Sequence, residues 1–306
     1  MKRTLKGTAL ALAAASIFSV APLVARAESG AVEPVSASAR SIAPQFTRYE
    51  LAVSKIYNKN VSAYTKVGLT HNGKALNTDA RVINGTTYVA VRSFFDELTN
   101  MTVSYISASR TVEIRGTGLE MDIIDGGNVI YANGRTLFSM SPSVIMTNGR
   151  MYAPLQSIAK ALGLSLSATS LSGTVKPLTP GKNYYAEDAV YWLSRIISAE
   201  SRGESLLGQI AVGSVVMNRV RSNLYPNTIW GVIFDRKYGV QFSPILDGSI
   251  HKEPTASAVV AAKITLEGFN VNSESLFFLY PNASTSSWIP NNREYLFSIG
   301  KHDFYA

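Results

Sequence analysis

The chain has 306 residues, enough for two ordinary domains with connecting segments. Hydrophobic residues make up 46% of it and charged residues 16%, which excludes a disordered chain and a bundle of membrane-spanning helices. The formal net charge is +8, and the absence of cysteine excludes a disulfide framework, a cysteine nucleophile and a zinc site made of thiolates.

Residues 1–27 have the pattern of a secretory signal peptide. Basic residues precede an apolar run from Thr8 to Val24, which ends in the small-residue cleavage site Ala25-Arg26-Ala27. We expect cleavage before Glu28, a secreted protein and no transmembrane segment after cleavage; the alternative is a membrane anchor, for which this interrupted run is short. The segment holds four basic and no acidic residues, so its removal lowers the formal charge from +8 to +4. That charge is too diffuse to predict nucleic-acid binding, but it suits attachment to an anionic wall or spore polymer.

Residues 28–48 are rich in Ala, Ser, Pro and Val and predict a flexible tether. A first folded domain is expected over residues 49–168, beginning with strands at Tyr49–Val53 and Val67–Leu69. Between Asn84 and Ala159 this domain contains an internal repeat, in which residues 84–95 align without a gap with residues 148–159. Each copy predicts a strand, an Asn-Gly hairpin turn, a second strand and a short amphipathic helix.

The two predicted helices carry equivalent apolar residues, namely Phe94, Phe95 and Leu98 in the first copy and Ile158, Ala159 and Leu162 in the second. Further strands are expected at Thr102–Ile106, Thr111–Ile114, Met121–Ile124 and Leu164–Leu166. With its paired Asn-Gly and Tyr pattern, this region resembles the small repeat domain at the N-terminus of copper amine oxidases. The resemblance implies a stalk or wall-association module. It does not imply copper, because the region has one histidine, His71, and no cysteine.

Gly and Pro without apolar periodicity predict a linker over residues 169–182, followed by a second domain over residues 183–306. In that domain a core-facing helix is expected from about Glu187, with Glu200 in its last turn before a break at Gly203. A largely buried helix follows from Leu206, and a third is expected at Ala256–Leu266. Gly208 and Gly213 would let the second helix approach the first closely, and Leu276–Tyr280 predicts a buried strand.

Glu200 is placed where its ionised form is disfavoured. A negative charge in the last helical turn opposes the helix dipole, and the neighbouring residues are apolar, so we expect a raised pKa, as a general acid near neutral pH requires. From spacing alone, a surface glutamate at a helix end explains the same pattern, and both interpretations stay open at this point.

A set of blocks in the second domain follows, in order, the motifs of the SleB/CwlJ family of cell-wall hydrolases. The blocks are Ile197–Glu204, Gln209, Val216–Arg219, Pro226–Ile229, Gln241–Ser243, Asp247–Gly248, Phe278–Asn282, Trp288 and Ile299–Tyr305. The resemblance implies an α+β chain whose second domain is lysozyme-like or lytic-transglycosylase-like, mainly helical with a small β hairpin. It also implies action on the glycan strands of peptidoglycan, spore cortex above all, and so a part in germination.

The resemblance places the catalytic role on Glu200. It implies substrate contacts for Gln241, Phe242, Ser243, Tyr280 and Trp288, although Phe242 and Trp288 could equally pack in a core. Glu204 is a second carboxylate that we expect to act at the start of the next helix rather than in catalysis. Asp247 and Glu267 are further carboxylates, and nothing in the sequence assigns either of them a catalytic role. Arg219 and His302 are expected to be structural. We expect no cofactor and no metal, peptidoglycan as the partner, and an anchoring or regulatory protein as a further partner.

A lytic transglycosylase can work with one glutamate, which first protonates the leaving oxygen and then deprotonates the C6 hydroxyl of N-acetylmuramic acid, leaving an anhydro sugar. Two other functions stay open. A zinc amidase would need clustered histidines, whereas this domain has only His251 and His302 and no His-Glu-x-x-His motif. A wall-binding protein with a silent hydrolase domain is the non-enzymatic alternative.

Overall fold

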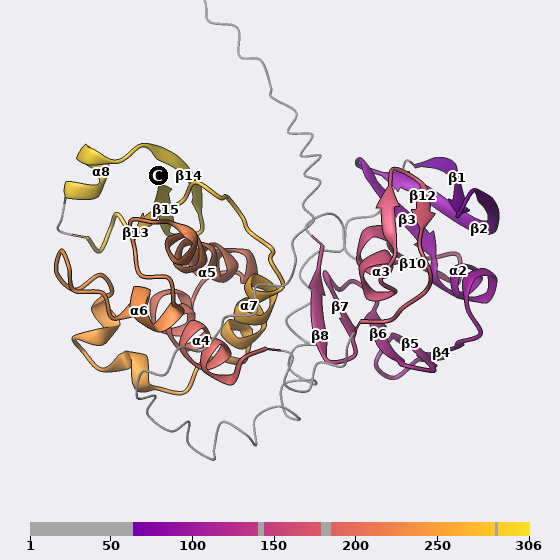
Figure 1. The fold of residues 1–306 in the computed structure, drawn as a ribbon, viewed down its shortest axis with the longest axis horizontal. Helices are drawn as coiled ribbons and strands as arrows, with labels where there is room; N and C mark the ends of the chain where they lie inside the picture. Colours follow the sequence, from indigo (N-terminus) through magenta and orange to yellow (C-terminus); the bar gives the residue numbers. More distant parts are fainter. Residues whose placement is uncertain (1–63, 140–143, 179–184, 285–286) are drawn as a thin grey trace, which may run out of the picture.

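The computed structural model describes residues 64–139, 144–178, 185–284 and 287–306. These residues form two lobes, a β-rich lobe made by the first part of the chain and a mainly helical lobe made by the last part (Figure 1). The α+β class predicted from the sequence is therefore confirmed. The predicted signal peptide, the tether and the strand at Tyr49–Val53 lie outside the described residues.

The two repeat copies meet at the β3–β10 pair of a seven-stranded sheet with the order β11-β12-β1-β2-β3-β10-β9. Its strands are β1 (Thr65–His71), β2 (Lys74–Ile83), β3 (Thr86–Ala90), β9 (Ile145–Thr147), β10 (Arg150–Pro154), β11 (Ser165–Ser167) and β12 (Ser170–Ser172). Strands β3 and β10 pair antiparallel, with Val89 opposite Ala153, its own equivalent in the repeat. The internal repeat is thus a local twofold arrangement, with α2 (Val91–Leu98) and α3 (Leu155–Ala161) following the central strands.

Both Asn-Gly turns take the backbone conformation that their residues favour. Asn84 and Gly85 have φ of 48° and 78°, and Asn148 and Gly149 have φ of 49° and 69°. Two successive residues in the left-handed region are what a tight two-residue hairpin requires. The hairpins predicted from these dipeptides are confirmed.

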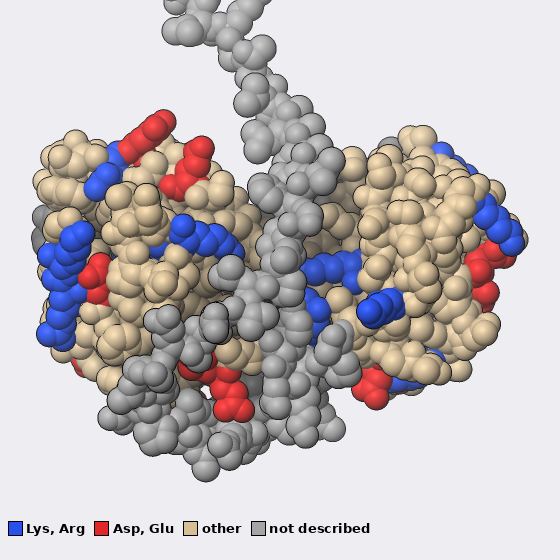
Figure 2. Space-filling model, in the orientation of Figure 1, with Lys and Arg blue, Asp and Glu red and all other residues tan. Residues whose placement is uncertain are grey.

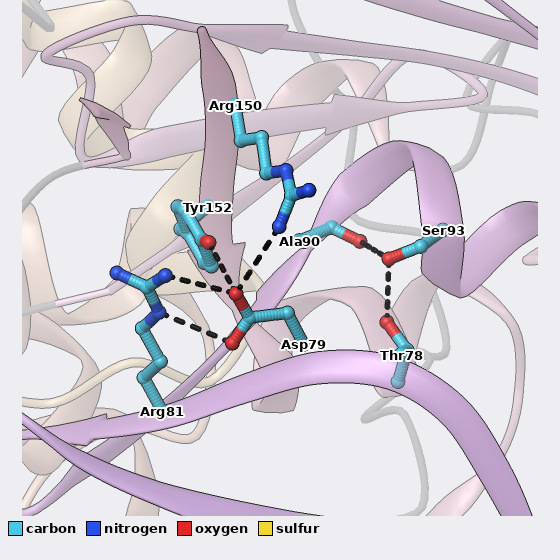
Figure 3. A network of polar contacts seen from close by, with 7 residues as sticks. All are labelled: Thr78, Asp79, Arg81, Ala90, Ser93, Arg150 and Tyr152. Atoms are coloured by element: carbon cyan, nitrogen blue, oxygen red, sulfur yellow. Dashed lines mark hydrogen bonds and ion pairs between the residues drawn. The ribbon is translucent and has the colours of Figure 1, made fainter. Parts of the chain in front are cut away.

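A polar network joins the two copies on the sheet (Figure 3). Asp79 of β2 accepts two hydrogen bonds from Arg81, at 3.1 and 2.8 Å, and one from the Tyr152 hydroxyl of β10 at 2.7 Å. Arg150 of β10 lies 3.5 Å from the same carboxylate. The hydrogen bond from Arg81, together with that from Tyr152, holds the pKa of Asp79 down at about 2.

A second sheet forms an antiparallel meander in the order β4-β5-β6-β7-β8. Its strands are β4 (Thr102–Ile106), β5 (Thr111–Gly116), β6 (Leu119–Ile124), β7 (Val129–Ala132) and β8 (Arg135–Phe138). The first three contain strands predicted from the sequence. One apolar core joins this sheet, the seven-stranded sheet and the helices α2 and α3, with Phe94, Ile114 and Ile158 fully buried in it.

The linker predicted over residues 169–182 is wrong in its first part. Ser170–Ser172 is strand β12, which pairs parallel with β1 through Thr70 and His71. Further on, the amide of Lys176 donates to the carbonyl of Leu162 at 2.8 Å. The first domain therefore extends past residue 168, because this polar segment is held by backbone pairing with strands that are distant in the sequence.

The helical lobe is built on three mutually packed helices, α4 (Glu187–Ser201), α5 (Leu206–Arg221) and α7 (Ala256–Leu266). Smaller elements surround them: α6 (Ile229–Ile233), the 3-10 turns η2 (Ser243–Ile245) and η3 (Ser249–His251), α8 (Trp288–Asn292), and a sheet in the order β13-β15-β14. The strands of that sheet are β13 (Phe277–Leu279), β14 (Tyr295–Ile299) and β15 (His302–Tyr305). The helix starts at 187 and 206, the third helix and the small hairpin are as predicted.

Close packing between helices depends on Gly213 of α5. A Cβ atom there would lie 2.9 Å from Ile197 Cδ1 of α4 and 2.8 Å from Thr265 Oγ1 of α7. Both distances are shorter than a Cβ atom tolerates, so the glycine allows α5 to touch α4 and α7 together. The close approach predicted for Gly213 is confirmed. Among the described residues, no helix combines the length and the apolar character needed to cross a bilayer.

The two lobes are joined by a buried carboxylate. Glu267, directly after α7, accepts hydrogen bonds from Arg135 Nε and Nη2 of β8 at 2.8 and 2.6 Å and from the Tyr185 hydroxyl at 2.7 Å. Lys160 Nζ of α3 lies 3.3 Å away. Apolar residues of the meander, Ile124, Val129 and Tyr131, also belong to the core of the helical lobe. The β-rich lobe is therefore docked on α7 and not merely connected by the chain, as the position of β8 in Figure 1 illustrates.

Candidate active site

Glu200 lies at the end of α4, one residue before the helix ends at Ser201. The helix is held in place by Leu193, Ile196 and Ile197, which are fully buried. Glu200 itself is half-buried, and its carboxyl forms no hydrogen bond or ion pair with the described part of the chain. Burial, followed by the negative charge of Asp247, raises its pKa to about 7. The raised pKa predicted from the sequence is confirmed, and a carboxyl in this state can both donate and accept a proton near neutral pH.

Asp247 is the carboxylate whose charge reaches Glu200, and it is in the opposite state. It lies in the exposed turn between η2 and η3, where the Ser249 amide donates to its Oδ1 at 2.8 Å. Hydrogen bonding by Ser249 lowers the pKa of Asp247. The pKa of one carboxyl is thus raised and that of the other lowered, a contrast that often separates acid and base roles in an active site. Asp247 belongs to the Asp-Gly block noted in the sequence, but nothing in the sequence assigned it a role.

Glu204 lies in the turn between α4 and α5, and its side chain is only 8% exposed. Its Oε2 accepts a hydrogen bond from the amide of Lys301, at 3.2 Å, in the turn between β14 and β15. Capping of α5 is done by Ser205, whose hydroxyl accepts from the amide of Gly208. Glu204, expected to act at the start of α5 by capping it or through the helix dipole, therefore does not cap that helix, because its carboxylate is directed to the hairpin turn.

Tyr280 and His302 are neighbours beside this turn. Tyr280 follows β13 and is half-buried, and its ring centroid lies 6.3 Å from that of His302. His302 is buried, and its Nδ1 lies 3.9 Å from Glu204 Oε1. Burial lowers the pKa of His302, partly offset by the charge of Glu204. Lys301 Nζ lies 5.9 Å from the Tyr280 ring.

The segment Gln241–Ser243 divides between surface and core. Ser243 is exposed and Gln241 half-buried, and η2, which Ser243 begins, packs against α4. Phe242 is 3% exposed and belongs to the core, with the Arg219 guanidinium 5.2 Å from its ring centroid. Phe242 is therefore withdrawn as a sugar contact, since a ring so covered presents no face to a ligand. Arg219 is structural as predicted, donating from Nε to the Leu276 carbonyl at 2.7 Å.

Trp288 differs from Phe242 in being 52% exposed. It begins α8 and packs against Phe277, with ring centroids 6.2 Å apart. Phe277 and Leu279 form one small apolar cluster, whereas Phe278 packs on the other face of the strand against the helical core. Trp288 thus lies on the outer face of the small sheet, and Tyr280, which contacts His302, lies by the inner one.

The structure places Asp247, in the η2–η3 turn, where its charge acts on Glu200 at the end of α4. It places Glu204, in the turn after α4, next to His302, which in turn neighbours Tyr280. His251, in η3, packs on α4 through Trp192, with ring centroids 6.3 Å apart. Over the part of the chain that the structure describes, no three His, Cys, Asp or Glu side chains are grouped as a metal site would require.

Comparison with known protein families finds one match in each lobe. Residues 203–305 match the model of the cell wall hydrolase family, and residues 70–176 match the copper amine oxidase N-terminal domain. The first match begins three residues after Glu200. The second extends to residue 176, in agreement with the position of β12 in the first domain.

Among curated proteins, the chain is similar to several spore cortex-lytic enzymes. The enzyme of Bacillus cereus is 36% identical over 122 residues, which are 40% of this chain and 46% of that protein. The enzyme of Bacillus subtilis is 33% identical over 120 residues, 39% of this chain and 38% of that protein. The chain thus spans less than half the length of these relatives.

A solved structure is also similar. It is the catalytic domain of the germination-specific lytic transglycosylase SleB from Bacillus anthracis, with 35% identity and a TM-score of 0.37; the match covers 40% of this chain and 98% of that domain.

Proposed function

We propose that this chain, whose residues 203–305 belong to the cell wall hydrolase family and whose residues 70–176 belong to the copper amine oxidase N-terminal domain family, cleaves the glycan strands of peptidoglycan, with Glu200 as acid and base. The observation that carries the proposal is the state of Glu200, a half-buried carboxyl at the end of α4 with a pKa of about 7. The similarity to spore cortex-lytic enzymes supports the choice of substrate.

The reaction follows from the two protonation states of this carboxyl. Protonated Glu200 donates its proton to the glycosidic oxygen as the bond from that oxygen to the anomeric carbon breaks. The anomeric carbon belongs to an N-acetylmuramic acid residue. The carboxylate then removes the proton of the C6 hydroxyl of that residue, and its O6 attacks the anomeric carbon. The product is a 1,6-anhydro sugar, no water is consumed, and Glu200 is protonated again at the end. A pKa near the working pH suits a group that must act in both directions.

Four residues are proposed to contact the glycan. Tyr280 presents a phenol beside His302, whose Nδ1 lies 3.9 Å from Glu204 Oε1 in the turn after α4. Gln241 and Ser243 present an amide and a hydroxyl on the segment that leads into η2. Trp288, half exposed on α8, offers an indole face on which a sugar ring can stack. Trp288 lies on the outer face of the small β-sheet. We therefore propose that it contacts a sugar of the glycan that is farther from the cleaved bond than the sugar that Tyr280 contacts.

The finer points of the function are part of the proposal. We propose a secreted, wall- or spore-associated enzyme that acts on cortex during germination, with the β-rich lobe as its wall-association module. On the face shown in Figure 2, cationic and anionic side chains lie in small groups, several of them side by side, among uncharged residues, so attachment would combine charge with neutral contacts.

A hydrolytic outcome is the second candidate, and the position of Asp247 favours it. Asp247 is an ionised carboxylate that interacts electrostatically with the acid Glu200, and it could activate water or stabilise positive charge at the anomeric carbon. Water, and not O6, would then complete the reaction and leave a reducing end. Amidase activity and a silent wall-binding role have no comparable observation in their favour.

The test is digestion of purified spore cortex and of vegetative walls with residues 28–306, in the wild-type sequence and as Glu200→Gln. We expect the wild type to release glycan fragments, faster from cortex, and Glu200→Gln to release almost none. The matched control is Glu253→Gln. It removes a carboxylate that forms an ion pair with Arg195 of α4, the helix that carries Glu200. Release that survives Glu200→Gln, or free stem peptides as the only product, would reject the proposal.

A further inference from the structure

The carboxylate of Glu204 occupies a site shaped for it in the turn between β14 and β15. Gly300, in that turn, has φ of 59°, and a Cβ atom on it would lie 1.8 Å from Glu204 Oε2. The carboxylate therefore fills the space that any other residue at position 300 would need. With the hydrogen bond from the Lys301 amide, this contact fixes the hairpin turn to the turn that follows α4.

The same carboxylate is next to a ring that supports Tyr280. His302 begins β15, directly after the hairpin turn, and lies among Phe278, Tyr280 and Phe304, with centroid distances of 5.6, 6.3 and 6.4 Å. Strand β15 also pairs with β13, which ends one residue before Tyr280. A shift of the hairpin turn would thus move both the strand and the ring on which the position of Tyr280 depends.

We propose that Glu204 and His302 are positioning residues, which hold Tyr280 in a fixed place relative to Glu200. Glu204 lies in the turn after α4, four residues after Glu200, and His302 begins β15, so their contact joins the element that carries the acid to the element next to the tyrosine. A misplacement of about 1 Å can reduce a rate about 100-fold, so such a contact has kinetic consequences without touching substrate. This inference rests on the proposed function for its kinetic part only.

Two variants disturb the contact in different ways. Glu204→Ala removes the carboxylate, whereas Gly300→Ala keeps it but takes its space. We expect each to lower kcat about 10- to 100-fold, with a smaller change in KM. Glu204→Gln, which keeps an acceptor for the Lys301 amide, should restore part of the loss. Glu253→Gln is the control, and all assays are run well below the unfolding temperature of each variant.

A double-mutant cycle distinguishes positioning from a general structural role. If Glu204 acts through Tyr280, Glu204→Ala should cost much less in a Tyr280→Phe background than in the wild type. If the two losses in kcat multiply independently, the inference is overturned. The cycle with His302→Gln in place of Glu204→Ala should give the same pattern.

A measurement independent of activity uses the purified protein with ring-labelled tyrosine. The NMR signal of Tyr280, assigned by its absence in Tyr280→Phe, should shift in Glu204→Ala and Gly300→Ala but not in Glu253→Gln. An unchanged Tyr280 signal in both variants would reject the inference. If the wild type releases no glycan product, the proposed function fails, and the NMR comparison still decides whether Glu204 positions Tyr280.

Discussion

Burial and the negative charge of Asp247 raise the pKa of Glu200 to about 7, so both protonation states of its carboxyl are populated near neutral pH. Because the first step requires the protonated form, kcat should fall as the pH rises through about 7. Asp247→Asn removes one of the two causes, so the alkaline limb of the pH profile of kcat should move to lower pH. The measurement is kcat against pH for both proteins, and coinciding alkaline limbs would show that Asp247 does not act on the acid.

The same raised pKa lowers the stability of the folded protein at neutral pH. The pKa of Glu200 is near its ordinary value of 4.5 in the unfolded chain and about 7 in the folded protein, so the stability that it contributes is fully present below pH 4.5 and is lost as the pH rises through 7. Glu200→Gln has no such dependence and should be more stable than the wild type at pH 8, by about 1–3 kcal/mol, and nearly equal at pH 4. Denaturant unfolding at both pH values checks this, and an equal difference at pH 4 and pH 8 would contradict it.

The sequence did not distinguish the roles of residues of the same chemical type; the structure did. The place of Glu200 at a helix end beside apolar residues could be predicted from local spacing, and so could its raised pKa. The influence of Asp247 could not, because it comes from a turn distant in the sequence. In the same way Phe242 and Trp288 looked equivalent, but the packing of Phe242 under Arg219 and the exposure of Trp288 depend on tertiary contacts.

The close packing of α5 against α4 and α7 can be tested at Gly213. Gly213→Ala would place a methyl group within 3 Å of both Ile197 and Thr265, so it should destabilise the protein by about 1–3 kcal/mol. Gly203→Ala is the control, since a Cβ atom there has nothing within 4 Å. Thermal unfolding of both variants measures the difference. Equal melting temperatures would mean that α5 does not depend on this close contact.

Elements with a clear hydrophobic period were predictable and those held by distant pairing were not. The apolar stripes predicted α4, α5 and α7, and the Asn-Gly dipeptides predicted two hairpins. Strand β12 escaped prediction because Ser170–Ser172 has no pattern of its own, and its place is set by parallel pairing with β1. That Ser205 and not Glu204 caps α5 could not be predicted either, because the Glu204 carboxylate accepts a hydrogen bond from a hairpin far along the chain.

At the scale of the whole molecule, Glu267 holds the two lobes together. Burial acts to raise its pKa, but the hydrogen bonds from Arg135 and Tyr185 outweigh this and lower it, so it is ionised at neutral pH. Glu267→Ala leaves the buried Arg135 guanidinium without this partner and should cost about 3–5 kcal/mol. Calorimetry should show one cooperative transition in the wild type and separate transitions for the two lobes in the variant.

The control for that experiment is Glu253→Ala, since Glu253 also pairs with a buried arginine but is itself 59% exposed. We expect it to cost no more than about 1 kcal/mol and to leave a single transition. If both variants unfold alike, the lobes are not coupled through Glu267. Sequence alone suggested a stalk joined by a linker, because neither Glu267 nor Arg135 carries a local pattern that indicates a partner in the other lobe.

The central claim is that Glu200 alone completes the cleavage of the glycan strand, and the masses of the products test it most directly. Cortex digested with the wild-type protein should give fragments ending in anhydro-muramic acid, lighter by one water than hydrolytic products, and Glu200→Gln should give none. Fragments with ordinary reducing ends, lost on Asp247→Asn as well as on Glu200→Gln, would contradict the single-carboxyl account and establish a hydrolase with two carboxylates.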